Sequence, residues 1–173
     1  MQISFRDVTS SDAQSLAHIL VNSNESFRGH IPDQCLKFNE EESAANWQVF
    51  LDGGLDEGHS LFLAIASSGM PVGYAWGCPT EDNSDYAGEL KQLAVLPDYH
   101  RMGIGRHLVR EAAQRLAMQS ITSMCVHVLE VNPNRAFYEH LGAQYVSQYA
   151  YDWDGFVSPM YVYGWPDISF LLS

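Results

Sequence analysis

The chain is poor in basic residues and has no long apolar run. Nine lysines and arginines stand against 21 aspartates and glutamates, so the net charge of the 173 residues is −12. This charge disfavours nucleic acid as a partner, because a phosphate backbone binds basic surfaces. No stretch reaches the roughly 18 apolar residues of a membrane helix. The N-terminus, MQISFRDVTSSD, shows no basic-then-apolar signal peptide. We therefore expect a cytoplasmic protein without a membrane partner.

Cysteine is scarce as well. Cys35, Cys78 and Cys125 are far apart and odd in number, so they form neither a C-x-x-C ligand pair nor a disulfide framework. We expect buried thiols and no metal site. The apolar content of 46% is typical of a folded chain, and 173 residues suffice for a substantial core. Because no Pro-, Gly- or Ser-rich linker divides the sequence, we expect one domain over residues 1–173.

The acidic residues are concentrated in the N-terminal half. Residues 1–90 hold 14 acidic and 3 basic side chains, whereas residues 91–173 hold 7 and 6, which gives net charges of −11 and −1. Five of the six basic residues in the second half are arginines, namely Arg101, Arg106, Arg110, Arg115 and Arg135. An anionic ligand would be drawn to this half. The acidic half either attracts a cationic second substrate or serves solubility alone.

Hydrophobic periodicity predicts the element order β-α-α-β-β-β-α-β-α-β-β. The expected strands are 2–7, 60–67, 70–78, 90–96, 122–129, 144–151 and 156–165, and a polar loop covers 80–87. The expected helices start at Thr9 and at Asn39, span 104–117, and span 132–141 with Asn132 as N-cap and Gly142 after the last turn. Because antiparallel hairpins alternate with two βα units, we expect a mixed sheet in an α/β (α+β) fold.

Residues 89–116 combine a strand, a glycine loop and a helix. Pro97 stops the strand, and Ile104, Leu108, Ala112 and Leu116 form the apolar stripe of the helix. A glycine loop that opens a helix presents unpaired N–H groups and the positive end of the helix dipole, which together bind anions. No Lys-Ser or Lys-Thr follows the glycines, as a Walker A loop requires. Leu108 stands where a dinucleotide fingerprint has its third glycine.

Two motifs resemble the GNAT superfamily of acyl-CoA-dependent N-acyltransferases. His100 to Gly105 (HRMGIG) is similar to its pyrophosphate loop, Q/R-x-x-G-x-G/A, at every position but the first. Val131 to Gly142 (VNPNRAFYEHLG) resembles the second GNAT signature, N-x-x-(x)-x-F-Y-E-x-x-G, which follows the fifth strand. Ala143 stands where the family usually has Phe. The resemblance covers roughly residues 60–146 by motif and the rest by element order.

The resemblance implies a mixed, mostly antiparallel sheet of about seven strands flanked by about four helices. The fourth and fifth strands should splay apart and hold acetyl-CoA, with pantetheine pairing like an extra strand. The loop N–H groups should hold the pyrophosphate, and Arg101 or Arg106 could add charge-assisted contacts. The implied cofactor-binding residues are Leu93, Ala94, Val95, His100, Arg101, Met102, Gly103, Ile104, Gly105, Arg106, Asn132 and Tyr138.

The implied reaction is attack of an amine on the thioester carbonyl of acetyl-CoA. Tyr138 stands at the family position of the general acid that protonates the leaving thiolate, and Glu89 is our candidate for the base. Glu130 and His127 are lesser candidates for the base. Backbone N–H groups around Val95 would stabilise the oxyanion.

The acceptor cannot be chosen from the sequence among small amines, antibiotics, amino acids and protein N-termini. Six aromatic residues in the first helices, their connector and the last hairpin either bind a cationic amine by cation–π contacts or only pack the sheet: Phe27, Trp47, Tyr149, Tyr151, Trp153 and Tyr161. Two other functions remain open, a non-catalytic acyl-CoA-binding sensor and a domain for another nucleotide. A homodimer is compatible with the family.

Overall fold

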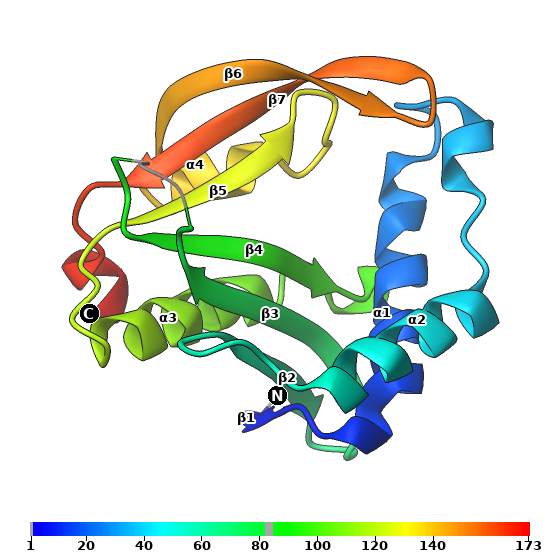
Figure 1. The fold of residues 1–173 in the computed structure, drawn as a ribbon, viewed down its shortest axis with the longest axis horizontal. Helices are drawn as coiled ribbons and strands as arrows, with labels where there is room; N and C mark the ends of the chain where they lie inside the picture. The colour runs from blue at the N-terminus through cyan, green and yellow to red at the C-terminus, as the bar shows by residue number, and fades with distance from the viewer. Residues whose placement is uncertain (1, 82–84) are drawn as a thin grey trace.

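A computed structural model describes residues 2–81 and 85–173, and part of the polar loop predicted over 80–87 therefore lies outside the described residues. The strands form one sheet in the order β1-β2-β3-β4-β5-β7-β6 (Figure 1). The strands are β1 (Ile3–Asp7), β2 (Ser60–Ala66), β3 (Pro71–Pro79), β4 (Gly88–Val95), β5 (Met124–Leu129), β6 (Gln144–Trp153) and β7 (Phe156–Trp165). The α-helices in these residues are α1 (Ala13–Asn24), α2 (Glu40–Gly53), α3 (Ile104–Ala117) and α4 (Ala136–His140). The predicted element order is confirmed.

The sheet is antiparallel except where β4 meets β5. These two strands run parallel and pair only through Gly88 with Met124 and Glu89 with Cys125. Beyond Glu89 they part, and Figure 1 shows β4 and β5 diverging toward α1. The mixed sheet and the splay of the fourth and fifth strands, both predicted, are confirmed.

The two faces of the sheet are covered by different helices. The predicted stripe of α3, with Ile104, Leu108, Ala112 and Leu116, is buried on one face beside Met124 and other residues of β5 and β7. The opposite face packs on α1 and α2 through residues such as Leu16, Trp47 and Tyr74. Within the described residues, no helix is long and apolar enough to cross a membrane.

The helix predicted over 132–141 is shorter than expected. Asn132 is not its N-cap, because the Asn132 side chain accepts a hydrogen bond from Asn134 N at 2.8 Å and closes a local turn instead. The helix therefore begins only at Ala136. Gly142 lies just past its end with φ 83°, in the left-handed region that favours glycine, as predicted.

An ion pair between the half-exposed Arg6 and the buried Asp12 anchors the start of α1. The Asp12 side chain, 7% exposed, accepts two hydrogen bonds from the Arg6 guanidinium at 2.8 Å and one from Thr9 N at 2.7 Å. These contacts lower the pKa of the Asp12 carboxyl to about 2, and the Arg6 hydrogen bonds are the largest cause. They join β1 to the beginning of α1, whose other end reaches the site described below.

We expect Asp12→Asn to lower the free energy of unfolding by about 2 kcal/mol near pH 7, because charge-assisted hydrogen bonds are lost. The folded-state pKa is lowered, so the contribution is present above the ordinary pKa of about 4. It is lost as the pH falls toward about 2. Urea unfolding at pH 7 and pH 3 measures the difference between variant and parent. Asp33→Asn, which removes a carboxylate 78% exposed, is the control and should change stability by less than about 0.5 kcal/mol. A difference that does not shrink at pH 3 would contradict this role of Asp12.

Candidate active site

A hollow of about 650 Å³ opens where β4 and β5 part. Its walls come from the end of β4, the loop before α3, α4 with the turn before it, and the last turn of α1. Ten of the twelve predicted cofactor-binding residues line it: Leu93, Ala94, Val95, His100, Arg101, Gly103, Gly105, Arg106, Asn132 and Tyr138. Met102 and Ile104 do not, because the Met102 side chain is 56% exposed to solvent and the Ile104 side chain is buried in the core under α3.

The end of β4 presents backbone groups to this hollow. Leu96 N–H donates to Val72 O of β3 at 2.9 Å, so by strand alternation the backbone groups of Leu93 and Val95 point away from β3. They point toward β5, which does not pair with this part of β4. The splay therefore leaves a short edge of unpaired strand inside the hollow.

His100 ties the loop to this strand end. Its Nε2 lies 2.9 Å from Val95 O, and because a carbonyl only accepts, Nε2 must carry a proton. The histidine therefore occupies one of the two lone-pair directions of Val95 O. The backbone groups of Leu93 and the N–H of Val95 remain directed at the hollow.

The loop backbone is bent into a shape that suits an anion. Arg101 has φ 60° and Gly103 has φ 80°, so the left-handed region is visited twice within three residues. For Arg101 this conformation costs on the order of 1 kcal/mol. Gly103 is also the N-cap of α3, where the first N–H groups have no partner within the helix. Such turned N–H groups at a helix start form a concave anion site, which Arg101 and Arg106 flank.

The second loop glycine serves close packing. A Cβ on Gly105 would lie 3.2 Å from Cζ of Phe137, so a larger residue would push this ring, and with it the packing of α4 on α3, by a few tenths of an ångström. The two glycines of the motif therefore serve different purposes. Gly103 adopts a left-handed backbone conformation, and Gly105 allows close contact with α4.

Tyr138 is held in an apolar wall of the hollow. Its ring packs against Phe137 at 5.2 Å and Trp165 at 6.5 Å between ring centroids, and the residue is 8% exposed. Burial raises the pKa of Tyr138 to about 12, so its hydroxyl stays protonated at physiological pH. Within residues 2–81 and 85–173, the hydroxyl has no hydrogen-bond partner, and it is not sealed from the hollow. It is available to donate to a ligand.

Glu89 lies in a second hollow, of about 500 Å³. Leu90 belongs to the core under α3, so its neighbour Glu89 points to the opposite face of the sheet. Tyr138 belongs to the core on the α3 side. The structure thus brings Tyr138 together with the loop and the β4 end, and places Glu89 apart from them, across the sheet.

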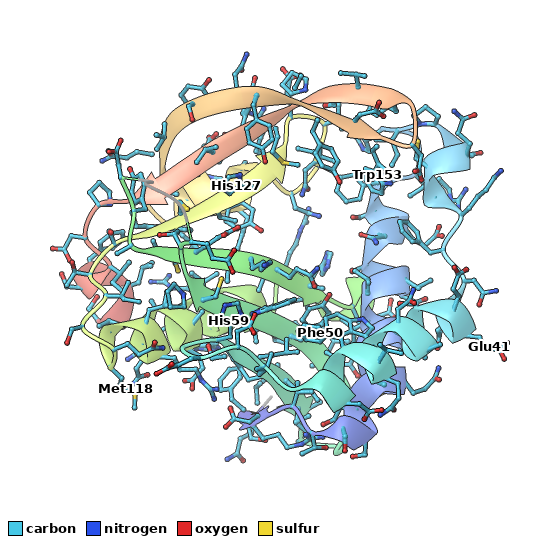
Figure 2. The ribbon with its side chains drawn as sticks, viewed as in Figure 1. Glu41, Phe50, His59, Met118, His127 and Trp153 are labelled. Carbon is cyan, nitrogen blue, oxygen red and sulfur yellow. The ribbon has the colours of Figure 1, made fainter. Side chains whose placement is uncertain are left out.

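The second hollow is acidic and aromatic. Asp85, Tyr86, Glu89, His127 and Tyr149 contribute to its wall, and none of its described lining residues is Lys or Arg. His127, labelled on β5 in Figure 2, has its Nδ1 3.0 Å from Tyr149 Oη. The pKa of Tyr149 is raised by burial and, to a smaller extent, by the charge of Glu89, which places that carboxylate nearby. Such a wall suits a cation better than an anion.

Glu130 and most of the aromatic residues considered for the acceptor lie outside the hollows. Glu130 accepts a hydrogen bond from Tyr161 Oη at 2.9 Å, and Trp47 is buried in the core between α2 and the sheet. Trp153 packs on Phe27 at the tip of the β6–β7 hairpin (Figure 2), with 5.5 Å between ring centroids. Of the six, only Phe27 and Tyr149 line a hollow.

Several lining residues were not predicted. Ser23, Asn24 and Ser26 bring the end of α1 into the first hollow, and Asp85 and Tyr86 reach the second from the loop before β4. The polar run SNES after the apolar part of α1 was the available signal. The helix α1 continues into this run as far as Asn24.

Three further side chains form a group that could attract a cation. Asp56, His59 and Glu81 place ligand atoms within 4.8 Å of one another. However, the Trp76 indole N–H donates to His59 Nδ1 at 3.2 Å, so the proton of the neutral imidazole lies on Nε2. The ring therefore offers no free lone pair while this bond holds.

Comparison with known proteins places this geometry in a family. The model of the Acetyltransferase (GNAT) family matches residues 24–143. The chain is 27% identical over 172 residues to the uncharacterized N-acetyltransferase YuaI of Bacillus subtilis, across 98% of this chain and 96% of that protein.

Two solved structures share the fold. The PaiA N-acetyltransferase from Thermoplasma acidophilum, in complex with coenzyme A, has a TM-score of 0.65 at 19% identity over 93% of this chain and 98% of its own. The ribosomal-protein-S18-alanine N-acetyltransferase of Escherichia coli has a TM-score of 0.68 at 19% identity over 96% and 94%. Since the family model spans well over half of the sequence, the chain belongs to the GNAT family of N-acetyltransferases.

Proposed function

We propose that this chain, acting as one domain, moves an acetyl group from acetyl-CoA to a primary amine by direct attack on the thioester. One observation carries the proposal. The hollow at the splay brings together an unpaired strand edge, a helix N-terminus with two arginines, and a tyrosine hydroxyl that opens into the hollow and has no hydrogen-bond partner among the described residues. These are the groups that the pantetheine amides, the pyrophosphate and the leaving thiolate require.

The binding roles follow from the direction of each group. The backbone N–H and C=O of Leu93 would pair with pantetheine as an added strand would, which leaves Val95 N–H for the thioester. The first turn of α3 would hold the pyrophosphate, with Arg101 and Arg106 supplying charge-assisted hydrogen bonds. The α1 side of the hollow is polar, through Ser23, Asn24 and Ser26. A polar wall favours the acetyl group over a long apolar acyl chain.

The chemical roles are divided between the two faces of the sheet. Tyr138, with its pKa raised to about 12 by burial, would keep its proton until the thiolate departs and then donate to sulfur. Val95 N–H would stabilise the oxyanion that develops on the thioester carbonyl. Glu89 would accept the proton of the amine, which must be neutral to attack, and the amine would come from the acidic second hollow.

The separation of Glu89 from Tyr138 also favours a second candidate, a non-catalytic acyl-CoA sensor. A sensor needs the first hollow and Tyr138 only for binding, and it does not need a base across the sheet. Catalysis requires that substrate bridge the two hollows.

Two measurements test the proposal in sequence. Thermal unfolding is followed with acetyl-CoA, ATP and NAD, and only acetyl-CoA should raise the midpoint. Thiol release from acetyl-CoA is then followed across a panel of primary amines. Turnover with at least one amine supports the enzyme. A shift without turnover for any amine supports the sensor, and a shift with ATP or NAD alone overturns both.

Tyr138→Phe should lower kcat by about 100-fold, because a general acid is lost while the ring and its packing stay. The dissociation constant for acetyl-CoA should change by less than about threefold, since most of the binding wall is untouched. Steady-state kinetics and calorimetry give the two values. Tyr151→Phe, at an exposed tyrosine outside both hollows, is the matched control and should leave both unchanged. Equal kcat values for Tyr138→Phe and the parent enzyme would rule out the acid role.

Glu89→Gln should lower kcat/KM for the amine by about tenfold to 100-fold at pH 7, because the amine loses its proton acceptor. The deficit should shrink as the pH rises toward the amine pKa of about 10, because a growing fraction of the free amine is already neutral. Rates between pH 7 and 9.5 at saturating acetyl-CoA measure this trend. Glu41→Gln, on the exposed face of α2, is the control. A deficit that stays constant with pH would assign Glu89 a structural role only.

A further inference from the structure

Tyr86 forms part of the second hollow at the end where β4 and β5 still pair. Cys125 of β5 pairs with Glu89 on one side and with Gly164 of β7 on the other, so these three residues form one row across the sheet. Tyr86 comes from the loop before β4, and its ring reaches this row, because a Cβ on Gly164 would overlap the Tyr86 ring. A glycine inside a strand often marks such a close approach. Gly164 is therefore the seat of the Tyr86 ring.

The backbone on both sides of Tyr86 is fixed as well. Thr80 Oγ1 donates to Tyr86 O at 2.7 Å, and Thr80 N–H donates to Ala87 O at 3.0 Å. Ala87 N–H in turn donates to Ser123 Oγ at 3.0 Å. These bonds tie the segment before β4 to the end of β3 and to the segment before β5. Tyr86 is thereby held as a preformed part of the wall.

The two carboxylates of this wall lack a cationic partner. Asp85 and Glu89 line the hollow, and none of its described lining residues is Lys or Arg, so the wall carries two negative charges when His127 is neutral. In the described part of the chain, neither carboxylate takes part in an ion pair. Lys91, two residues after Glu89, lies over the Trp76 ring, 5.0 Å from its centroid, and is not part of the wall. Two uncompensated charges in a hollow of about 500 Å³ favour a small ligand with two positive charges.

The strand pairing sets the direction in which an acceptor lies in this hollow. The strands β4 and β5 pair at Glu89 and part beyond it, so the side of His127 and Tyr149 leads toward the splay, where acetyl-CoA would lie. Asp85 and Tyr86 precede β4 and stand at the opposite, paired end. An amine that reacts at the splay therefore directs the rest of its molecule at Tyr86 and Asp85. An aromatic face next to a carboxylate binds a cation by cation–π contact and by charge.

We propose that the acceptor is a small diamine, and that Tyr86 and Asp85 determine this specificity by holding its second ammonium group. The inference rests on the acetyl transfer proposed above. One nitrogen, as the free amine, bonds to the thioester carbon and gives up one proton, while the C–S bond breaks and the sulfur takes up one proton. The other nitrogen stays protonated beside Asp85. A second acetylation would place the neutral amide of the first product against Asp85, so it should be slow.

A set of matched acceptors tests the assignment. Linear diamines of increasing chain length are each compared with the monoamine and the amino acid of the same length, at saturating acetyl-CoA. The best diamine should have a kcat/KM about tenfold or more above that of its monoamine, because the second ammonium adds a cation–π and a charge contact. The amino acid should be poorer than the monoamine, since its carboxylate would face Asp85. Mass spectrometry should show the monoacetylated diamine as the main product.

Asp85→Asn isolates the contact with the second charge. The ratio of kcat/KM for the diamine to kcat/KM for the monoamine should fall about tenfold, whereas a merely structural effect would lower both values alike. Gly164→Ala should lower the same ratio, because its Cβ displaces the Tyr86 ring, and Tyr86→Leu takes its place if that variant does not fold. Asp33→Asn, at an exposed carboxylate outside both hollows, is the matched control and should leave the ratio unchanged. Circular dichroism checks the fold of each variant.

A binding measurement separates this inference from the proposed acetyl transfer. The diamine is titrated calorimetrically into the chain saturated with coenzyme A, and Asp85→Asn should raise its dissociation constant about tenfold, with or without turnover. Selective diamine binding without turnover of any amine would contradict the acetyl transfer alone. Equal binding of diamine and monoamine, or a folded Asp85→Asn that binds the diamine as the parent does, would overturn the diamine assignment. An unchanged ratio in a folded Gly164→Ala or Tyr86→Leu would overturn the role of Tyr86.

Discussion

The parting of β4 from β5 after Glu89 is the constraint on which the rest of the structure depends. Two residue pairs hold these parallel strands together, and the ladder then stops. A register shift opposite Trp76 and Gly77 makes Lys91 an extra residue in β4 just beyond this point. A bulge increases twist and re-aims a strand, and just beyond Glu89 β4 parts from β5 while it stays paired with β3. Unpaired backbone groups are costly when buried, so a strand edge inside a fold implies a ligand or water to satisfy it.

The charged residues are divided between the two hollows that lie where β4 and β5 part. The first hollow has Arg101, Arg106 and the start of α3 in its wall, and the second has Asp85 and Glu89. The two arginines come from the near-neutral C-terminal half of the sequence and the two carboxylates from the strongly acidic N-terminal half, and these halves meet close to the start of β4. An anionic donor and a cationic acceptor would therefore meet where the sheet opens, each on the side whose charge attracts it.

The sequence was most informative where structure is local. The stripe of α3 and the strand–loop–helix order follow from spacing within a few residues, and the structure has them as predicted. Asn132 was mispredicted because its side chain had two local options, an N-cap or a turn, and spacing alone did not distinguish them. The separation of Glu89 from Tyr138 depends on which face of the sheet each side chain lies on, and that is decided by how the strands and helices pack. Trp47 is buried against residues of α1 and β3 and does not line a hollow, and this burial likewise depends on tertiary contacts.

His100 shows how a departure from the family motif can preserve its geometry. Gln or Arg at this position would bring a donor on a long, flexible side chain, whereas imidazole brings one donor on a rigid ring. That donor is used within the protein, on Val95 O. The bond makes the end of β4 and the anion loop one unit, because the loop cannot shift without losing a hydrogen bond at the strand end. The remaining backbone groups of Leu93 and Val95 and the turned N–H groups after Arg101 are thereby held in fixed relation. A ligand with amides at one end and a pyrophosphate at the other needs both sets at once, and a preformed spacing between them spares the protein the entropy of ordering its loop on binding.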